Sequence, residues 1–190
     1  MALRDIKPTR SELINLKRKI QLSERGYKIL KMKRDGLILE FFKILKNAKD
    51  TRGDLLSKYA KAVEMMAVAN TVEGAIGVKS AAFSVKEVPE ITLKSKNIMG
   101  VVVPQIESSK VKKSLVDRGY GVLGTSTVID ETASAFEDLV ESIIESAEIE
   151  TTMKRLLDEI EKTKRRVNAL EYKVIPVSYT HLTLPTKRIV

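Results

Sequence analysis

The apolar residues between Leu13 and Val72 recur at alternating intervals of three and four residues. Of the 18 positions in this register, 14 are apolar, against 8 of 18 in the register that begins one residue later. A mean period of 3.5 residues kept over this length predicts one long helix whose apolar side packs along another helix. The positions of this first seam are Leu13, Leu16, Ile20, Ser23, Tyr27, Leu30, Arg34, Leu37, Phe41, Ile44, Ala48, Thr51, Leu55, Lys58, Ala62, Met65, Ala69 and Val72.

The same spacing returns in the C-terminal half, between Ala135 and Val174. Nine of the 12 positions of this second seam are apolar, and Asp130 is placed to cap the helix that carries it. The positions are Ala135, Leu139, Ser142, Ser146, Ile149, Met153, Leu156, Ile160, Thr163, Val167, Leu170 and Val174. Two seams in one chain predict a mainly α fold, a long antiparallel two-helix coiled coil formed by the N- and C-terminal helices.

The central region, residues 73–129, lacks this spacing and contains several glycines and prolines. Residues 90–94 alternate polar and apolar side chains, Val101–Val103 are β-branched, and residues 96–100 between them have the composition of a turn. We therefore expect a small β-hairpin, which should pack on the helices or on a partner because two strands alone are marginally stable in water.

The last residues, 177–190, lose both the apolar repeat and the charge density, and Pro185 bars a continuous helix. We expect this tail to be non-native or disordered, which would leave about the first 20 residues of the N-terminal helix without a partner helix. The predicted organisation is an N-terminal coiled-coil helix (1–72), a central region (73–129), a C-terminal coiled-coil helix (130–176) and this tail (177–190).

Composition supports a coiled coil over a compact core. Charged residues make up 31% of the chain, aromatic residues make up 5%, and tryptophan is absent. The absence of cysteine excludes disulfides and thiolate metal sites and suits a reducing compartment. No apolar run approaches the roughly 20 residues of a membrane-spanning helix, and the N-terminus has no signal-peptide pattern, so we expect a cytoplasmic protein.

The net charge of +9 is unevenly distributed. Residues 1–50 carry 14 Lys or Arg against 6 Asp or Glu, whereas residues 130–150 carry 8 acidic residues and no basic one. This opposition predicts charge-matched packing between the helices, or partners of opposite sign.

The candidates for chemistry are weak. Residues 118–124 contain a formal G-x-G-x-x-G, but a charged segment precedes it and no βαβ unit surrounds it, so we interpret it as a turn before the second helix. There is no phosphate-binding G-x-x-x-x-G-K-[ST] loop, and the lone His181 lies in the tail. We predict no catalytic residue, no cofactor and no metal site.

A basic stretch in the N-terminal helix is the strongest charge feature. It is open to three interpretations, namely the solvated flank of a coiled coil, a contact with a partner protein, or a nucleic-acid contact. Its candidate binding residues are Lys17, Arg18, Arg25, Lys28, Lys33 and Arg34. Arg34 occupies a seam position, so it should turn outward or meet a carboxylate.

Three segments resemble the D-subunit family of the V/A-type ATPases. Residues 8–35, beginning Pro-Thr-Arg-Ser-Glu-Leu, are similar to its first helix, and Ser95–Val101 followed by Pro104 to its central hairpin. Residues 163–172, Thr-Lys-Arg-Arg-Val-Asn-Ala-Leu-Glu-Tyr, resemble its last helix. The three segments occur in the family's order, and the resemblance covers roughly residues 1–176.

The resemblance implies a non-catalytic central-stalk rotor of an archaeal or bacterial V-ATPase or A-type ATP synthase, a peripheral complex on the cytoplasmic face of the membrane. Its implied partners are the catalytic hexamer of A and B subunits, the F subunit, and the C subunit (named d in eukaryotes), which leads to the membrane rotor. Within the hairpin, Asn97, Ile98 and Met99 are then candidate contacts. Such a stalk couples ATP synthesis or hydrolysis to proton or sodium transport.

Two alternatives remain. A basic helical hairpin also suits a nucleic-acid-binding protein, and its seams suit a coiled-coil scaffold that dimerises. The sequence does not distinguish proton from sodium coupling, or synthesis from hydrolysis.

Overall fold

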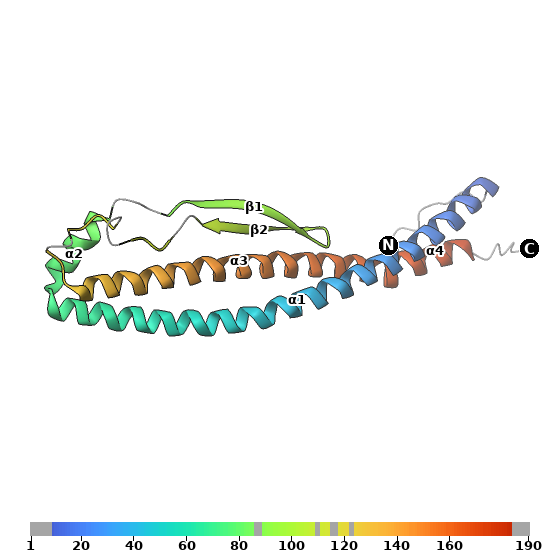
Figure 1. Ribbon diagram of the computed structural model, residues 1–190. Helices are drawn as coiled ribbons and strands as arrows, with labels where there is room; N and C mark the ends of the chain where they lie inside the picture. Colours follow the sequence, from blue (N-terminus) through green and yellow to red (C-terminus); the bar gives the residue numbers. More distant parts are fainter. Residues whose placement is uncertain (1–8, 86–88, 109–110, 115–117, 122–123, 184–190) are drawn as a thin grey trace, which may run out of the picture. The chain divides into compact units, whose positions relative to one another are not determined.

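The computed structural model describes residues 9–85, 89–108, 111–114, 118–121 and 124–183. The elements in chain order are α1 (Arg10–Val72), α2 (Gly74–Ser84), β1 (Ile91–Ile98), β2 (Val101–Ser108), α3 (Thr127–Ala169), the π-helical turn η1 (Leu170–Val174) and α4 (Ile175–Leu182) (Figure 1). The chain divides into a first unit, Met1–Phe41 with Leu156–Val190, and a second unit, Phe42–Arg155.

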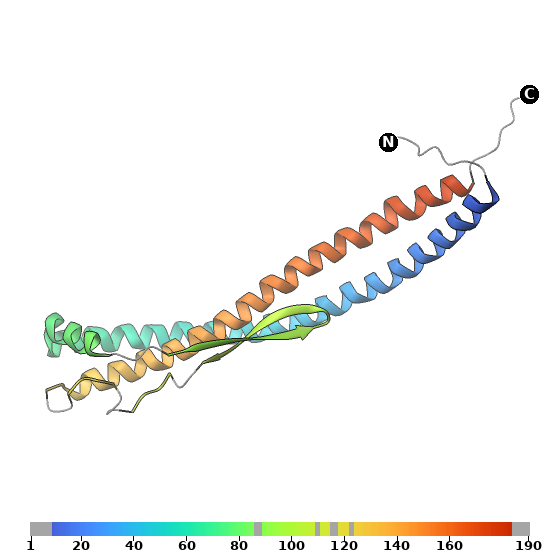
Figure 2. The same ribbon diagram turned by 90° about the horizontal axis from the view of Figure 1, so that it is seen from above.

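In the first unit, the N-terminal part of α1 runs antiparallel to the C-terminal part of α3 and to α4 (Figure 2). Lys33 Nζ lies 3.4 Å from Glu159 Oε1, and the Tyr179 hydroxyl donates a 2.7 Å hydrogen bond to Glu24 Oε1. Side chains of both seams are buried between these segments, namely Ile20, Leu37, Leu156, Thr163 and Val167.

In the second unit, the C-terminal part of α1 pairs with the N-terminal part of α3. Ala62 packs with Ala135 and Leu139, and Met65 and Phe136 lie against this cluster. The Thr132 hydroxyl contacts the main-chain oxygen of Met65 at 3.2 Å, and Lys58 Nζ lies 2.6 Å from Ser142 Oγ. Later residues of α1 thus meet earlier residues of α3, so this pair is also antiparallel.

The burial pattern confirms both seams. In the first seam all positions except Leu13, Lys58 and Val72 are buried or half-buried, and in the second seam every position is. The predicted mainly α fold, with antiparallel pairing of the N- and C-terminal helices and a central β-hairpin, is therefore confirmed.

The start of α3 differs from the prediction that Asp130 caps it. Helix α3 already begins at Thr127, and the Val128 N–H donates to Ser126 Oγ at 3.2 Å, as in a helix cap. Asp130 lies in the first turn and binds side chains of the preceding loop instead.

The hairpin is longer than predicted, because the turn takes only two residues. β1 and β2 pair antiparallel, with Ile98 opposite Val101. Met99 and Gly100 both have positive φ, 51° and 86°, as a type I′ turn requires, and the Gly100 N–H donates to Asn97 Oδ1 at 2.8 Å. Residues 96–98, predicted to lie in the turn, therefore belong to β1.

The hairpin packs against α3, as expected for a pair of strands that needs support (Figure 1). Val101 and Val103 are buried. The main chain of β2 is held directly, because the Ile106 N–H donates to Glu148 Oε2 at 2.9 Å and Arg155 Nη1 donates to the Val102 oxygen at 2.7 Å. Side chains of α3 thus satisfy main-chain groups of β2.

Helix α2 was not predicted. Its glycines, Gly74 and Gly77, are among the glycines and prolines of the central region, which lacks the apolar repeat. Gly74 does break α1, with φ of 74°, but the chain resumes a helix at once. Within the second unit, α2 lies at the end where α1 finishes and α3 begins (Figure 1).

Helical structure also continues past Pro176. Proline cannot donate a main-chain hydrogen bond and its ring clashes with the preceding turn of a regular α-helix. Here the wider turn η1 precedes it, with the Ile175 N–H bonded to the Leu170 oxygen, and α4 extends to Leu182. Residues 184–190 lie outside the described residues, and the non-native origin of 177–190 stays a prediction. No helix in the described part of the chain is both long and apolar enough to cross a bilayer.

Candidate functional site

Four of the basic candidates are exposed on α1 in the first unit, namely Lys17, Arg18, Arg25 and Lys28. The other two are half-buried and have partners within the chain. Lys33 pairs with Glu159, and Arg34 bonds Asp35 Oδ1 through Nε and Nη2 at 2.9 and 2.7 Å. The prediction that Arg34 meets a carboxylate is confirmed, and the four exposed cations are the ones available to a partner.

The hairpin candidates belong to the second unit. Asn97 and Ile98 end β1, and Met99 forms the turn with its side chain exposed. Asn97 Oδ1 accepts a hydrogen bond from the Gly100 N–H, so the side-chain oxygen of Asn97 stabilises the turn. The basic candidates thus belong to the first unit and the hairpin candidates to the second, and each set forms a candidate surface of its own unit.

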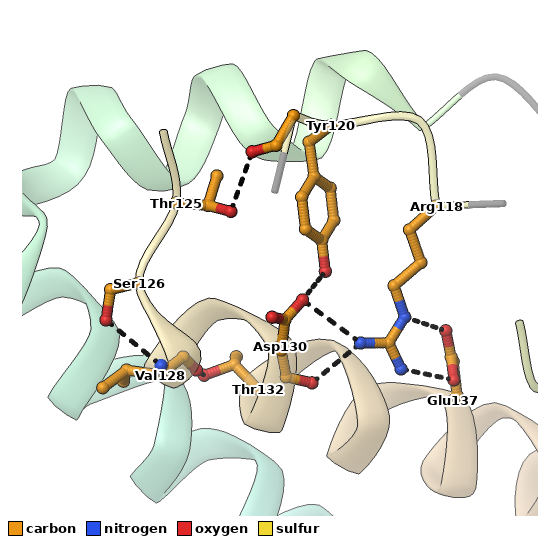
Figure 3. A network of polar contacts seen from close by, with 9 residues as sticks. Arg118, Tyr120, Thr125, Ser126, Val128, Asp130, Thr132 and Glu137 are labelled. Atoms are coloured by element: carbon orange, nitrogen blue, oxygen red, sulfur yellow. Dashed lines mark hydrogen bonds and ion pairs between the residues drawn. The ribbon is translucent and has the colours of Figure 1, made fainter. Parts of the chain in front are cut away.

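The strongest polar arrangement in the described residues lies where the loop before α3 meets that helix (Figure 3). Arg118 Nε and Nη2 donate to the two carboxylate oxygens of Glu137 at 3.1 and 3.0 Å. Arg118 Nη1 also donates to the main-chain oxygen of Asp130 at 3.0 Å. The Tyr120 hydroxyl donates to Asp130 Oδ1 at 2.7 Å, so two loop side chains are fixed to the first turns of α3.

Burial and pairing shift the pKa values of this network. Burial lowers the pKa of Arg118, but its hydrogen bond to Glu137 and its contact with Tyr120 raise it, and the net pKa lies above the ordinary value. Burial raises the pKa of Tyr120, and the hydrogen bond to Asp130 raises it further. Both groups therefore keep their protons at neutral pH, and the network holds a stable charge pattern.

Gly119 shows why this loop needs glycine. Its φ is +84°, and a Cβ atom built there would lie 2.7 Å from the main-chain oxygen of Ser84 at the end of α2. The loop is therefore in close contact with α2 on one side and bonded to α3 on the other. Gly119 serves this packing, whereas a Cβ atom built at Gly121 or Gly124 would meet nothing within 4 Å. The loop precedes α3, in agreement with its interpretation as a turn before the second helix.

The Arg118 network was not predicted, because the acidic segment 130–150 was expected to pair with basic residues of the other helix or of a partner. Lys112, likewise before α3, lies 2.8 Å from Asp138 Oδ1 and 3.6 Å from Glu141 Oε2. The acidic residues at the start of α3 thus bind cations of the loop that precedes it. The hydrogen bond from Lys112 and its charge lower the pKa of Asp138.

None of these arrangements provides a nucleophile with an adjacent base. In the described residues no three His, Asp or Glu side chains come together as metal ligands would. What the chain presents is helical surface that carries exposed apolar and basic side chains, the chemistry of protein contacts.

Comparison with known proteins identifies the family. The family model of the ATP synthase D subunit matches residues 12–180. The A-type ATP synthase D subunit of Methanoregula boonei is 89% identical over 176 residues, which cover 93% of this chain and 84% of that protein. The A-type ATP synthase D subunit of Methanosarcina mazei is 66% identical over 93% of this chain and 84% of its own length. That of Haloarcula marismortui is 57% identical over 93% of this chain and 76% of its own length. The chain therefore belongs to the D-subunit family of the ATP synthases.

Proposed function

We propose that this chain is the central-stalk rotor of an A-type ATP synthase, a non-catalytic subunit that transmits torque. ATP is made or hydrolysed between the A and B subunits around it, and ions cross the membrane in a separate ring. Membership of the D-subunit family supports the proposal that the chain is part of an ATP synthase complex. The observation that carries the role is the antiparallel helix pairing, supported by both seams in each unit.

Paired helices suit the transmission of torque for a physical reason. Helix α1 is continuous over 63 residues, so its main-chain hydrogen bonds run through both units. Interlocked side chains along a seam resist sliding and rotation of one helix against the other, because each displacement opens packed contacts. A twist applied to one helix is therefore shared by its partner.

The partners follow from the same proposal. The first unit, with exposed Lys17, Arg18, Arg25 and Lys28, contacts the hexamer of A and B subunits. The F subunit binds the central region 73–129 and the helices beside it, and the C subunit connects the stalk to the membrane rotor. The complex is peripheral, on the cytoplasmic face of the membrane.

Co-assembly tests this proposal. The chain, mixed with the A and B subunits of the Methanoregula boonei enzyme, should form a stoichiometric complex, with and without residues 177–190. Deletion of residues 84–106 should weaken binding of the F subunit and leave the hexamer bound. A chain that fails to join A and B subunits would contradict the proposal.

The exposed cations keep a second candidate, nucleic-acid binding, open to test. Phosphate contacts would give affinity for random duplex DNA that falls steeply with salt. Such binding, without association to A and B subunits, would favour that function over the stalk.

A further inference from the structure

Helix α1 carries a second row of apolar side chains in the first unit, and this row is exposed. Leu22, Ile29, Met32 and Leu39 have 72%, 61%, 65% and 65% of their surface accessible. We call these four residues the outer stripe. They follow one another at intervals of seven, three and seven residues, which is the spacing of one face of a packed helix.

The outer stripe lies on the side of α1 that faces away from the first seam. Its positions are two residues later than seam positions such as Ile20 and Leu37, which are buried. Since each residue turns an α-helix by roughly 100°, this offset places the stripe about 160° around the helix. The contacts of α1 with α3 and α4 therefore leave these four side chains uncovered.

Exposed apolar side chains scattered over a surface need no explanation, but a row in register does. A polar residue at each position would give the helix the same seam and better solubility. The spacing fits a surface that packs along α1 from outside, as a second helix or an elongated groove would.

The charges beside the stripe specify its occupant. Arg18 lies one turn before Leu22 on this face, Arg25 lies between Leu22 and Ile29, and Lys28 lies next to Ile29. All three are exposed. Residues 1–50 also have 14 basic against 6 acidic residues, so this face of a second copy would be repelled. The complementary surface is apolar and flanked by carboxylates.

We infer that the outer stripe is the main contact of the first unit with the hexamer of A and B subunits, in an apolar groove flanked by acidic side chains. This inference rests on the proposed function and deepens it. The basic candidates from the sequence then have a supporting role, while Leu22, Ile29, Met32 and Leu39 provide the buried anchors.

The two sets of residues should affect different rate constants. Truncating a buried apolar anchor removes contacts that hold the complex together, and it acts mainly on dissociation. Exposed charges at the edge of an interface speed the approach of the partners, and their effect weakens with salt. Kinetics can therefore separate anchors from steering charges.

The experiment uses the full chain and the hexamer of A and B subunits, with binding followed by surface plasmon resonance at two salt concentrations. Ile29→Gln with Met32→Gln should raise the dissociation rate constant about tenfold or more, at both salt concentrations. Arg25→Gln with Lys28→Gln should lower the association rate constant and reduce its salt dependence. Leu56→Gln with Tyr59→Gln, on the same helix in the second unit and similarly exposed, is the matched control.

The outcomes are distinct. Unchanged dissociation for the Ile29→Gln, Met32→Gln chain would overturn the inference while leaving the stalk function intact. An equal loss in the Leu56→Gln, Tyr59→Gln control would also overturn it, because the effect would then not belong to the stripe. A wild-type chain that does not bind the hexamer would contradict the proposed function itself. Circular dichroism confirms that each variant keeps its helix content.

Discussion

Arg118 and Glu137 form a two-bond ion pair in which the side chain of Arg118 is only 8% exposed and that of Glu137 17% exposed. Parallel hydrogen bonds of this kind fix both the distance and the orientation of the partners. The pair joins a loop with little regular structure to α3, which carries one seam. It is one of the contacts that hold the central region to α3, together with those of Tyr120 and Lys112.

Removal of one partner of this pair should be costly. Glu137→Ala leaves a buried guanidinium without its two-bond carboxylate partner, and we expect a loss of about 3 kcal/mol in the free energy of unfolding. Urea denaturation followed by circular dichroism measures this change. Arg165→Gln, which removes the exposed pair with Glu161 one turn away, should cost under about 0.5 kcal/mol. Equal effects of the two variants would contradict the role of the Arg118 pair.

The raised pKa of Tyr120 predicts a loss of stability at alkaline pH. Its folded pKa lies above the ordinary 10.0 because burial and the hydrogen bond to Asp130 favour the protonated phenol. The contribution is therefore fully present below the unfolded pKa and is lost as pH rises through the folded one. The stability difference between wild type and Tyr120→Phe should shrink over this alkaline range, measured by urea denaturation at several pH values. A stability difference that stays constant or grows with rising pH would contradict the assigned hydrogen bond between Tyr120 and Asp130.

Substitution of Gly119 by alanine should destabilise the protein, whereas the same substitution at Gly121 should have little effect. In Gly119→Ala the Cβ atom meets the Ser84 oxygen at 2.7 Å in a backbone with φ of +84°, so we expect a loss of about 2 kcal/mol. Gly121→Ala is the control, because a Cβ there meets nothing within 4 Å. Thermal unfolding and amide exchange of residues 118–121 compare the two. A larger effect at Gly121 would refute the close approach to α2.

Removal of the Thr163 hydroxyl should stabilise the folded protein. Its side chain is buried in the second seam, and its Oγ1 has no hydrogen-bond partner in the described part of the chain. Thr163→Val keeps the shape and removes the unpaired polar atom, so the free energy of unfolding should rise by about 1 kcal/mol. In Thr132→Val, by contrast, the lost hydroxyl contacts the oxygens of Met65 and Val128. That variant should be no more stable than wild type, and stabilisation at Thr132 alone would contradict the account.

The helical seams could be predicted from the sequence because a heptad repeat is a local pattern that recurs at many positions. The position of Leu37 or Leu156 in the core follows from spacing alone. The pairing of Arg118 with Glu137 could not be derived in this way, since it depends on how a glycine-rich loop folds between α2 and α3. Helix α2 was missed because Gly74 and Gly77 outweighed the apolar residues around them. The hairpin turn was predicted too long, because a two-residue turn here requires positive φ at Met99, which residues other than glycine rarely adopt.

Of the two sets of candidate contact residues in the first unit, the sequence predicted the basic residues but not the outer stripe. The charge run of Lys17, Arg18, Arg25 and Lys28 is visible in the sequence as composition. The outer stripe needs the structure, because Ile29 and Met32 become informative only when the burial of Ile20 and Leu37 shows which side of α1 is already covered.

Rotation of the chain inside the assembled complex tests the central claim most directly. The chain has no cysteine, so Phe83→Cys, exposed in α2, gives a single point for attaching a bead. With the hexamer of A and B subunits fixed to a surface, ATP should drive rotation of the bead in one direction. ATP hydrolysis by an assembled hexamer whose bead stays still would contradict the proposal that this chain is the rotor.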